Sequence, residues 1–237
     1  MIAVITGAGR RLGYELAKHL LGRNWQVVGS YRTHYSEVDE LASLGADMTR
    51  LELTDLDAVD AWIQGVVDRY PHISLLVHNA SAFTPTPDEP LDGAKRFAEF
   101  FQIHMQVPYL VNERCVEALQ RCPETHGNII HITDITVQKA EPQFRTYCAT
   151  KAGLQSLSDS YAQLLAPKVR VNAILPGPLE FLPEHTEAAR QKVLAATPLK
   201  IMGGFQPVVK TVDYILDNDY LTGASIRVDG GRSLTGG

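Results

Sequence analysis

The sequence predicts an α/β protein: a doubly wound parallel sheet with helices packed on both of its faces. Two observations support this. Several apolar runs are too continuous for a sheet with one face in water, and the stretches between them carry helical periodicity, as at Leu12, Leu16 and Leu20. Regular alternation of strand and helix is typical of a parallel sheet with right-handed crossovers. With 237 residues, 45% of them apolar, the chain is long enough to form one domain over residues 1–237.

Six apolar runs predict the strands of this sheet. They cover residues 2–6, 25–30, 73–78, 128–133, 169–175 and 224–228. The segment 176–206 is rich in proline and glycine and has no clear strand. Because it follows the end of a late strand, we expect it to form a mobile lid over the substrate.

Charge and cysteine content limit the partners and the location. A formal charge of −5 with mixed signs argues against nucleic acid or an anionic membrane as a partner. Cys115, Cys122 and Cys148 form no C-x-x-C pattern, which fits reduced thiols. No apolar run approaches the ~18 residues of a membrane span, and a strand at 2–6 leaves no room for an export signal. We therefore expect a soluble cytoplasmic protein, and the histidine spacing predicts no metal site.

A glycine-rich turn follows the first predicted strand and leads into a helix. This is the context of a Rossmann-type dinucleotide-binding turn, in which glycines let the backbone approach a pyrophosphate at a helix N-terminus. The residues of this candidate cofactor site are Gly7, Gly9, Arg10, Arg11, Leu12 and Gly13.

The end of the second predicted strand indicates which cofactor is used. NAD-specific sites usually carry an acidic residue there, whereas this chain has Tyr31, Arg32 and Thr33. With Arg10, these side chains are suited to a 2′-phosphate, so we expect NADPH. The alternative is that Arg32 is an ordinary solvated arginine.

Tyr147 and Lys151 stand four residues apart, and Asp134 precedes the tyrosine by thirteen residues. On a helix this spacing puts the tyrosine and the lysine on one face. We expect the ammonium of Lys151 to favour the ionised phenol, which makes Tyr147 a usable proton donor.

Several motifs together resemble the short-chain dehydrogenase/reductase family along nearly the whole chain. They are Thr6 to Gly13, His78-Asn79-Ala80-Ser81, Tyr147-x-x-x-Lys151, Pro176-Gly177 and Val228-Asp229-Gly230-Gly231. The departures from the usual pattern are similar to the pteridine reductase branch. Arg11 occupies the second glycine of the turn, Asp134 replaces the usual catalytic serine, and Ser81 and Phe83 follow the Asn-Ala pair.

The resemblance implies an NADPH-dependent reductase of 7,8-dihydropterins, with dihydromonapterin as the main substrate and dihydrofolate as a poorer one. It also implies a homotetramer. The roles that it carries over are catalysis by Asp134, Tyr147 and Lys151; cofactor contacts by Asn79, Ala80, Tyr147, Lys151, Pro176 and Gly177; and pterin contacts by Arg11, Ser81, Phe83, Asp134 and Tyr147.

Simpler interpretations stay open for several of these residues. Phe83 is alternatively an ordinary core residue, Ser81 a turn residue and Asp134 a loop cap. His104 stands where most of the family has an asparagine that holds a relay water, and it either alters that relay or only packs at the helix bend. Two rival functions also remain: a generic carbonyl reductase of the 3-oxoacyl type, and a catalytically silent NADPH-binding regulator.

Overall fold

The computed structural model describes residues 1–182 and 185–235. Its centre is one seven-stranded sheet in the order β3-β2-β1-β4-β5-β6-β7, and all six strand pairings are parallel. The predicted doubly wound sheet is therefore confirmed. Its strands are β1 (Ile2–Thr6), β2 (Gln26–Tyr31), β3 (Asp47–Arg50), β4 (Leu75–His78), β5 (Gly127–Ile132), β6 (Val169–Pro176) and β7 (Ser225–Val228).

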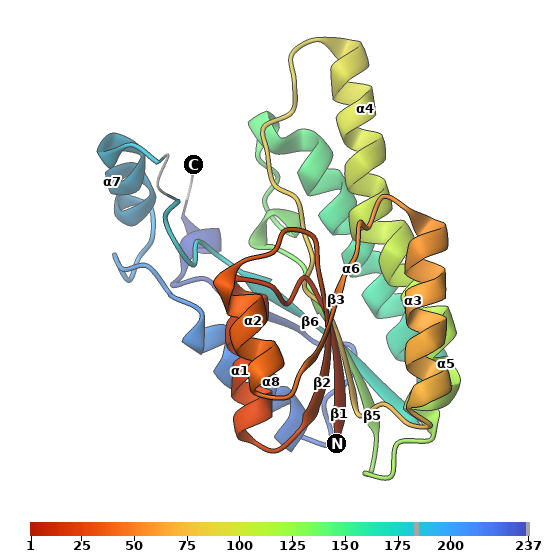
Figure 1. Ribbon diagram of the computed structural model, residues 1–237. Helices are drawn as coiled ribbons and strands as arrows, with labels where there is room; N and C mark the ends of the chain where they lie inside the picture. The colour runs from red at the N-terminus through yellow and green to blue at the C-terminus, as the bar shows by residue number, and fades with distance from the viewer. Residues whose placement is uncertain (183–184, 236–237) are drawn as a thin grey trace.

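Helices cover both faces of the sheet (Figure 1). One face carries α1, α2 and α8, and the other carries α3, α5 and α6. The helices are α1 (Arg11–Gly22), α2 (Ser36–Ser43), α3 (Leu56–Arg69), α4 (Pro90–Phe101), α5 (Val107–Gln120), α6 (Arg145–Leu165), α7 (Glu187–Ala195) and α8 (Gln206–Asp217).

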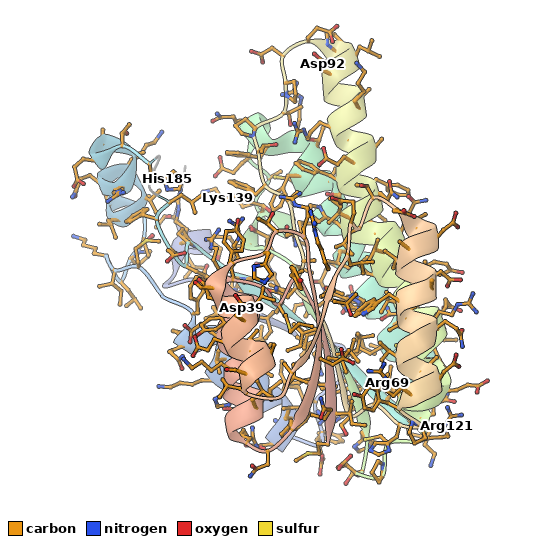
Figure 2. All side chains as sticks on the ribbon, viewed as in Figure 1. Asp39, Arg69, Asp92, Arg121, Lys139 and His185 are labelled. Carbon is orange, nitrogen blue, oxygen red and sulfur yellow. The ribbon has the colours of Figure 1, made fainter. Side chains whose placement is uncertain are left out.

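The first strand shows why the sheet needs both layers. Ala3 and Ile5 pack into the core beneath α1 and α8, whereas Val4 between them packs into the core beneath α3 and α5. Side chains alternate across a strand, so a run of apolar residues buries both faces. Charged side chains such as those of Asp39, Arg69 and Arg121 lie on the outer surfaces instead (Figure 2).

The sequence did not predict strand β3. Its residues, Asp47–Arg50, are mostly polar and none of them is buried. The strand lies at the edge of the sheet and pairs only with β2 among the described residues. An edge strand that is partly in water needs no apolar run, so the hydrophobic pattern gave no signal.

The connection between α4 and α5 is a π-helical turn, Gln102–Gln106, that continues the two helices without a break. Such turns insert one extra residue per turn and often occur at functional sites. His104 lies in this turn with an exposure of 1%. The turn therefore aims an imidazole into the interior, close to the carboxyl ends of the central strands.

Strand order reverses between β1 and β4, because β2 and β3 extend the sheet to one side and β5 to β7 to the other. In open α/β sheets, ligands bind in the crevice at the carboxyl ends of the strands on either side of such a reversal. The loops after β1 and β4 are thus the expected place for a site. No helix in the described ranges is long and apolar enough to cross a membrane.

Candidate active site

The turn after β1 is tied to the loop after β4 by the backbone and side chain of Thr6. Its hydroxyl accepts hydrogen bonds from the amide N–H groups of Asn79 and Ala80, both at 3.2 Å. The Asn79 side-chain amide in turn donates to the carbonyl oxygens of Thr6 and Gly7, at 3.2 and 2.9 Å. Two loops that are distant in sequence are thereby held at the reversal point of the sheet.

Glycine is required within this turn for steric reasons. A Cβ atom on Gly13 would lie 2.2 Å from the carbonyl oxygen of Gly7, and one on Gly7 would lie 2.8 Å from the Cα of Ala80. The first turn of α1 contains no acidic residue, and no described side chain caps its N-terminus. Its backbone N–H groups are therefore available to an anion, which the helix dipole favours.

Arg11 has a backbone conformation that normally favours glycine. Its φ is +54°, in the left-handed region that costs a non-glycine residue about 1 kcal/mol or more. The side chain reaches two residues of the segment 176–206: Nε lies 3.1 Å from a carboxylate oxygen of Glu180, and the guanidinium lies 6.0 Å from the centre of the Phe205 ring. Arg11 therefore links the glycine-rich turn to the segment 176–206.

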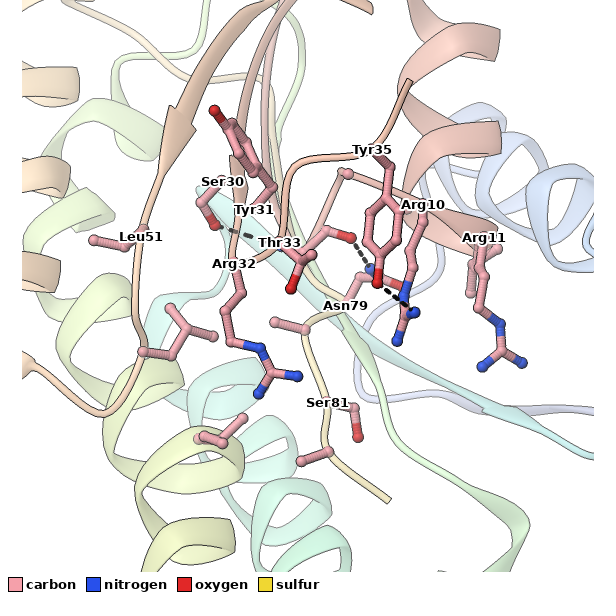
Figure 3. Close-up of a pocket in the computed structure, with 18 of the residues that line it drawn as sticks. Arg10, Arg11, Ser30, Tyr31, Arg32, Thr33, Tyr35, Leu51, Asn79 and Ser81 are labelled. Carbon is pink, nitrogen blue, oxygen red and sulfur yellow. Dashed lines mark hydrogen bonds between the residues drawn. The ribbon is translucent and has the colours of Figure 1, made fainter. Parts of the chain in front are cut away.

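The cleft at this edge has a volume of about 270 Å³ and brings together twelve of the predicted residues (Figure 3). They are Gly7, Gly9, Arg10, Arg11, Leu12, Gly13, Tyr31, Arg32, Thr33, Asn79, Ala80 and Ser81. Three arginines against a single acidic residue, Glu52, give the lining a positive balance in a chain of net charge −5. A polyanionic ligand suits such a cleft.

One corner of the cleft contains a residue that sequence reasoning missed. The guanidinium of Arg10 donates to the hydroxyl of Tyr35 at 2.8 Å and lies 5.2 Å from the centre of its ring. Arg32, which follows the end of β2, also extends into the cleft (Figure 3). Tyr35 stands only two residues after Thr33, so its closeness in sequence to a predicted site residue could have identified it. Nothing in the sequence identifies the apolar lining residues Leu51, Leu53 and Ile103 as part of the cleft.

Tyr147 and Asp134 form the second part of the site. The phenolic hydroxyl donates to Oδ2 of Asp134 at 2.8 Å, while Oδ1 accepts the backbone N–H of Thr136 at 2.8 Å. Asp134 is therefore a loop cap and a partner of the tyrosine at once. Burial, then the charge of Asp134 and its hydrogen bond, raise the pKa of Tyr147 well above its ordinary value.

Lys151 lies on the same face of α6 as Tyr147, as the spacing predicts, and its Nζ is 5.8 Å from the centre of the tyrosine ring. Nζ donates to the carbonyl oxygen of Ile132 at 2.9 Å. Burial lowers the pKa of Lys151 to about 8, against the opposing effect of Asp134. Burial and Asp134 together keep the phenol of Tyr147 protonated in this geometry, and the effect expected of the Lys151 ammonium on the phenol stays a prediction.

Phe83 and Ser81 connect the two parts of the site. The Phe83 ring packs edge-on against Tyr147, with centres 4.9 Å apart, and is stacked on Phe144 at 4.4 Å. It is 53% exposed, so it is not a core residue. Phe144 was not predicted, because nothing local in sequence signals the stacking. Ser81 lines the cleft, and its hydroxyl lies 3.0 Å from His104 Nε2.

Pro176 and Gly177 end β6 at the same edge of the sheet, but they are not part of the cleft lining. The Gly177 N–H donates to the carbonyl oxygen of Val228 at 3.0 Å. A Cβ atom on Gly177 would lie 2.8 Å from the Cα of Asp229. The structure thus places this pair against the end of β7. Phe83, Asp134, Tyr147 and Lys151 are likewise not part of the lining, but they contact one another around Tyr147, which is hydrogen-bonded to the lining residue Ser81.

This fold and this arrangement of side chains define a dinucleotide-binding oxidoreductase scaffold, and comparison with known proteins identifies the family. A sequence model of the family described as enoyl-(acyl carrier protein) reductase matches residues 7–233. The chain therefore belongs to that family of short-chain dehydrogenases/reductases.

The relatives that resemble the whole chain are more specific. A dihydromonapterin reductase of Citrobacter koseri is 37% identical, covering 98% of this chain and 96% of the relative. The dihydromonapterin reductase of Escherichia coli strain K12 is 38% identical with the same coverage. Among solved structures, FolM alternative dihydrofolate reductase 1 from Brucella canis, complexed with NADP, is 28% identical and has a TM-score of 0.89. That similarity covers 100% of this chain and 95% of the Brucella chain.

Proposed function

We propose that this protein is an NADPH-dependent reductase of 7,8-dihydropterins, acting mainly on dihydromonapterin and more weakly on dihydrofolate. The observation that carries the proposal is the hydrogen bond from Tyr147 to Asp134 at 2.8 Å. A ketone acquires negative charge on its oxygen when it is reduced and needs donors there. A carboxylate would repel that charge. A dihydropterin instead presents amino and ring N–H groups, which a carboxylate can accept.

The names and extent of the relatives support the same substrate class. The two dihydromonapterin reductases match over 98% of this chain. The Brucella structure, which matches over 100% of this chain and 95% of its own, was solved with NADP. These are properties of the relatives, and we extend them to this chain because it belongs to the same family and has Tyr147, Lys151 and Asp134 at its candidate site.

The residues present fit NADPH. The free N–H groups at the start of α1 suit its pyrophosphate. Arg10 and Arg32, with Tyr31 and Thr33 beside them, suit the 2′-phosphate, because guanidinium groups bind phosphate through charge-assisted hydrogen bonds. We assign Asn79 and Ala80 to the adenosine side, and Lys151, Tyr147, Pro176 and Gly177 to the nicotinamide side. When bound, NADPH supplies the hydride that C6 of the pterin receives.

The side chains around the reacting ring have separate tasks. Tyr147 holds a proton near N5, since its raised pKa keeps the phenol protonated at neutral pH. Asp134 orients the phenol and accepts N–H groups of the substrate. Phe83 offers an exposed aromatic face for the flat ring. Arg11 donates toward the carbonyl and N5 side.

We propose that segment 176–206 is a lid over this substrate position. Leu179 and Phe205, near its two ends, line the cleft, and Glu180 pairs with Arg11. Both contacts join the segment to residues that we assign to ligand binding. Residues 183 and 184 lie outside the described ranges.

We also propose that residues 1–237 form one domain that assembles as a cytoplasmic homotetramer. Strands from residue 2 to residue 228 share a single sheet, which supports one domain. Tyr109 on α5 and Leu164 on α6 are 53% and 69% exposed, which supports an interface there. The three cysteines are free thiols, as in reducing compartments. Light scattering coupled to size-exclusion chromatography tests the assembly.

The experiment that tests the function is turnover of the purified protein with a substrate panel. NADPH oxidation is followed by absorbance with 7,8-dihydromonapterin, 7,8-dihydrobiopterin, dihydrofolate, an acetoacetyl thioester and an enoyl thioester. The thioesters are included because the family model carries the description enoyl-(acyl carrier protein) reductase. We expect the highest kcat/KM with dihydromonapterin. Turnover of a thioester without turnover of any pterin would overturn the proposal.

A further inference from the structure

His104 lies at the centre of a buried chain of hydrogen bonds beside the cleft. Its Nε2 accepts the backbone N–H of Ala82 at 3.2 Å and lies 3.0 Å from the hydroxyl oxygen of Ser81. Its Nδ1 lies 2.8 Å from the hydroxyl oxygen of Thr150. Both ring nitrogens are thus engaged within the protein.

This series of hydrogen bonds begins at a backbone N–H group and ends at a backbone carbonyl oxygen, and these two groups fix the direction of each hydrogen bond between them. The Ala82 N–H can only donate, so Nε2 is an acceptor and the ring proton is on Nδ1. The Thr150 hydroxyl donates to the carbonyl oxygen of Tyr147 at 2.9 Å, so it is free to accept from Nδ1–H. Because Nε2 has no proton, the Ser81 hydroxyl is the donor in its contact with His104, and it shares the single Nε2 lone pair with the Ala82 N–H.

The ring stays neutral at physiological pH, which preserves this arrangement. Burial, and next the charge of Lys151, lower the pKa of His104 to about 2. The competing acceptor beside Ser81 is the phenolic oxygen of Tyr147, which is neutral and donates its own proton to Asp134. A neutral phenol oxygen accepts hydrogen bonds more weakly than an imidazole nitrogen, so the Ser81 proton stays on the His104 side.

We propose that His104 makes Ser81 a pure hydrogen-bond acceptor toward the cleft, and so selects substrates that present a donor there, such as the 2-amino group of a pterin. Ser81 is exposed and lines the cleft, so with its proton directed at His104 its hydroxyl offers only lone pairs to a ligand there. A 2-oxo ring would meet these lone pairs with its own oxygen. This inference rests on the proposed pterin function, and it makes His104 a positioning residue that never touches the substrate.

Two substitutions at one position test the proposal, because asparagine and glutamine mimic different ring nitrogens. The amide of His104→Gln reaches the position of Nε2 and can still accept from Ser81. The amide of His104→Asn reaches only the position of Nδ1, which frees the Ser81 hydroxyl to turn. The measurement is the ratio of kcat/KM for a 7,8-dihydropterin to that for the 2-oxo dihydrolumazine with the same side chain, with NADPH affinity measured by fluorescence.

We expect the wild type and His104→Gln to prefer the 2-amino compound. In His104→Asn the ratio should fall about tenfold, as loss of one neutral hydrogen bond allows, with unchanged NADPH affinity. An unchanged ratio in His104→Asn, or an equal fall in His104→Gln, would overturn the proposal. A merely structural role for His104 would lower both activities together and leave the ratio alone.

A second readout does not depend on the substrate. Nitrogen-15 NMR of histidine-labelled protein reports which ring nitrogen of His104 carries the proton, with His104→Gln used to assign the signal. A proton on Nδ1 supports the inference, and a proton on Nε2 overturns it. If the wild type reduces neither ring, the proposed function and the amino selectivity fail together, whereas a wild type that reduces both rings equally refutes the selectivity alone.

Discussion

Substitution of Asp134 distinguishes the proposed dihydropterin reductase from a generic carbonyl reductase. Asp134→Ser restores the residue that is usual in the wider family, and it removes the carboxylate that accepts from Tyr147. We expect kcat/KM for dihydromonapterin to fall roughly 10²-fold, within the range for groups that act in proton transfer. Affinity for NADPH should change little. Steady-state kinetics and fluorescence titration measure both.

Asp134→Asn is the matched control, since it keeps an oxygen that can accept the Thr136 N–H. If the charge matters, Asn should lose nearly as much pterin activity as Ser while folding normally. Full activity in both variants would show that Asp134 is only a loop cap, and the carbonyl reductase would become the better interpretation.

Lys151 gives the site a pH dependence. Its pKa of about 8 means that the free protein carries a protonated ammonium below that pH and a neutral amine above it. Since we assign the ammonium to the cofactor ribose, kcat/KM for NADPH should decline as the pH rises through about 8. That parameter reports the pKa values of groups in the free enzyme.

Lys151→Met should lower activity about 10²-fold and remove the decline of kcat/KM with pH in this range. If the variant shows the same decline in kcat/KM near pH 8, the decline is caused by a group other than Lys151.

Among the elements, the end of β2 is the one to which we assign the choice of cofactor. Arg32 and Thr33 line the cleft, and so does Arg10, which is hydrogen-bonded to Tyr35. We expect the wild type to prefer NADPH over NADH by at least about tenfold in kcat/KM, a difference near 1.4 kcal/mol. Arg32→Ala should shrink this preference chiefly by raising the KM for NADPH.

Arg50, which donates to the Arg32 carbonyl oxygen from β3, is a suitable control position. Arg50→Ala removes a nearby positive charge that does not line the cleft, so it should leave the preference almost intact. Equal use of NADPH and NADH by the wild type would contradict the assignment of this corner to a 2′-phosphate.

Local sequence patterns predicted most of the strands and helices. The features that the sequence did not predict depend on contacts between residues far apart in the chain or at the edge of the sheet. The strand runs and the Tyr147 to Lys151 spacing are signals within a few residues, so they could be interpreted directly. Strand β3 escaped because its polar residues pair at a wet edge. The ion pair of Arg11 with Glu180 joins residues far apart in the chain, and no periodicity encodes it. The raised pKa of Tyr147 also depends on a packed geometry that spacing alone does not give.

At the scale of the whole molecule, an acidic chain encloses a positively lined cleft. Its net charge is −5, yet the lining contains Arg10, Arg11 and Arg32. Capture of an anionic cofactor should therefore depend on this local field and weaken as salt screens it. We expect kcat/KM for NADPH to fall severalfold between low and high ionic strength, with kcat nearly constant. A salt-independent kcat/KM would argue against electrostatic capture.

The central claim is that the site delivers hydride to C6 of a dihydropterin. Incubation of the protein with 7,8-dihydromonapterin and NADPH carrying two deuterium atoms at C4 of the nicotinamide tests it directly, with mass spectrometry and proton NMR of the product. We predict tetrahydromonapterin with one deuterium, at C6. The account would be contradicted by a product without deuterium or with deuterium at another carbon. It would also be contradicted if the protein reduced a thioester but formed no pterin product.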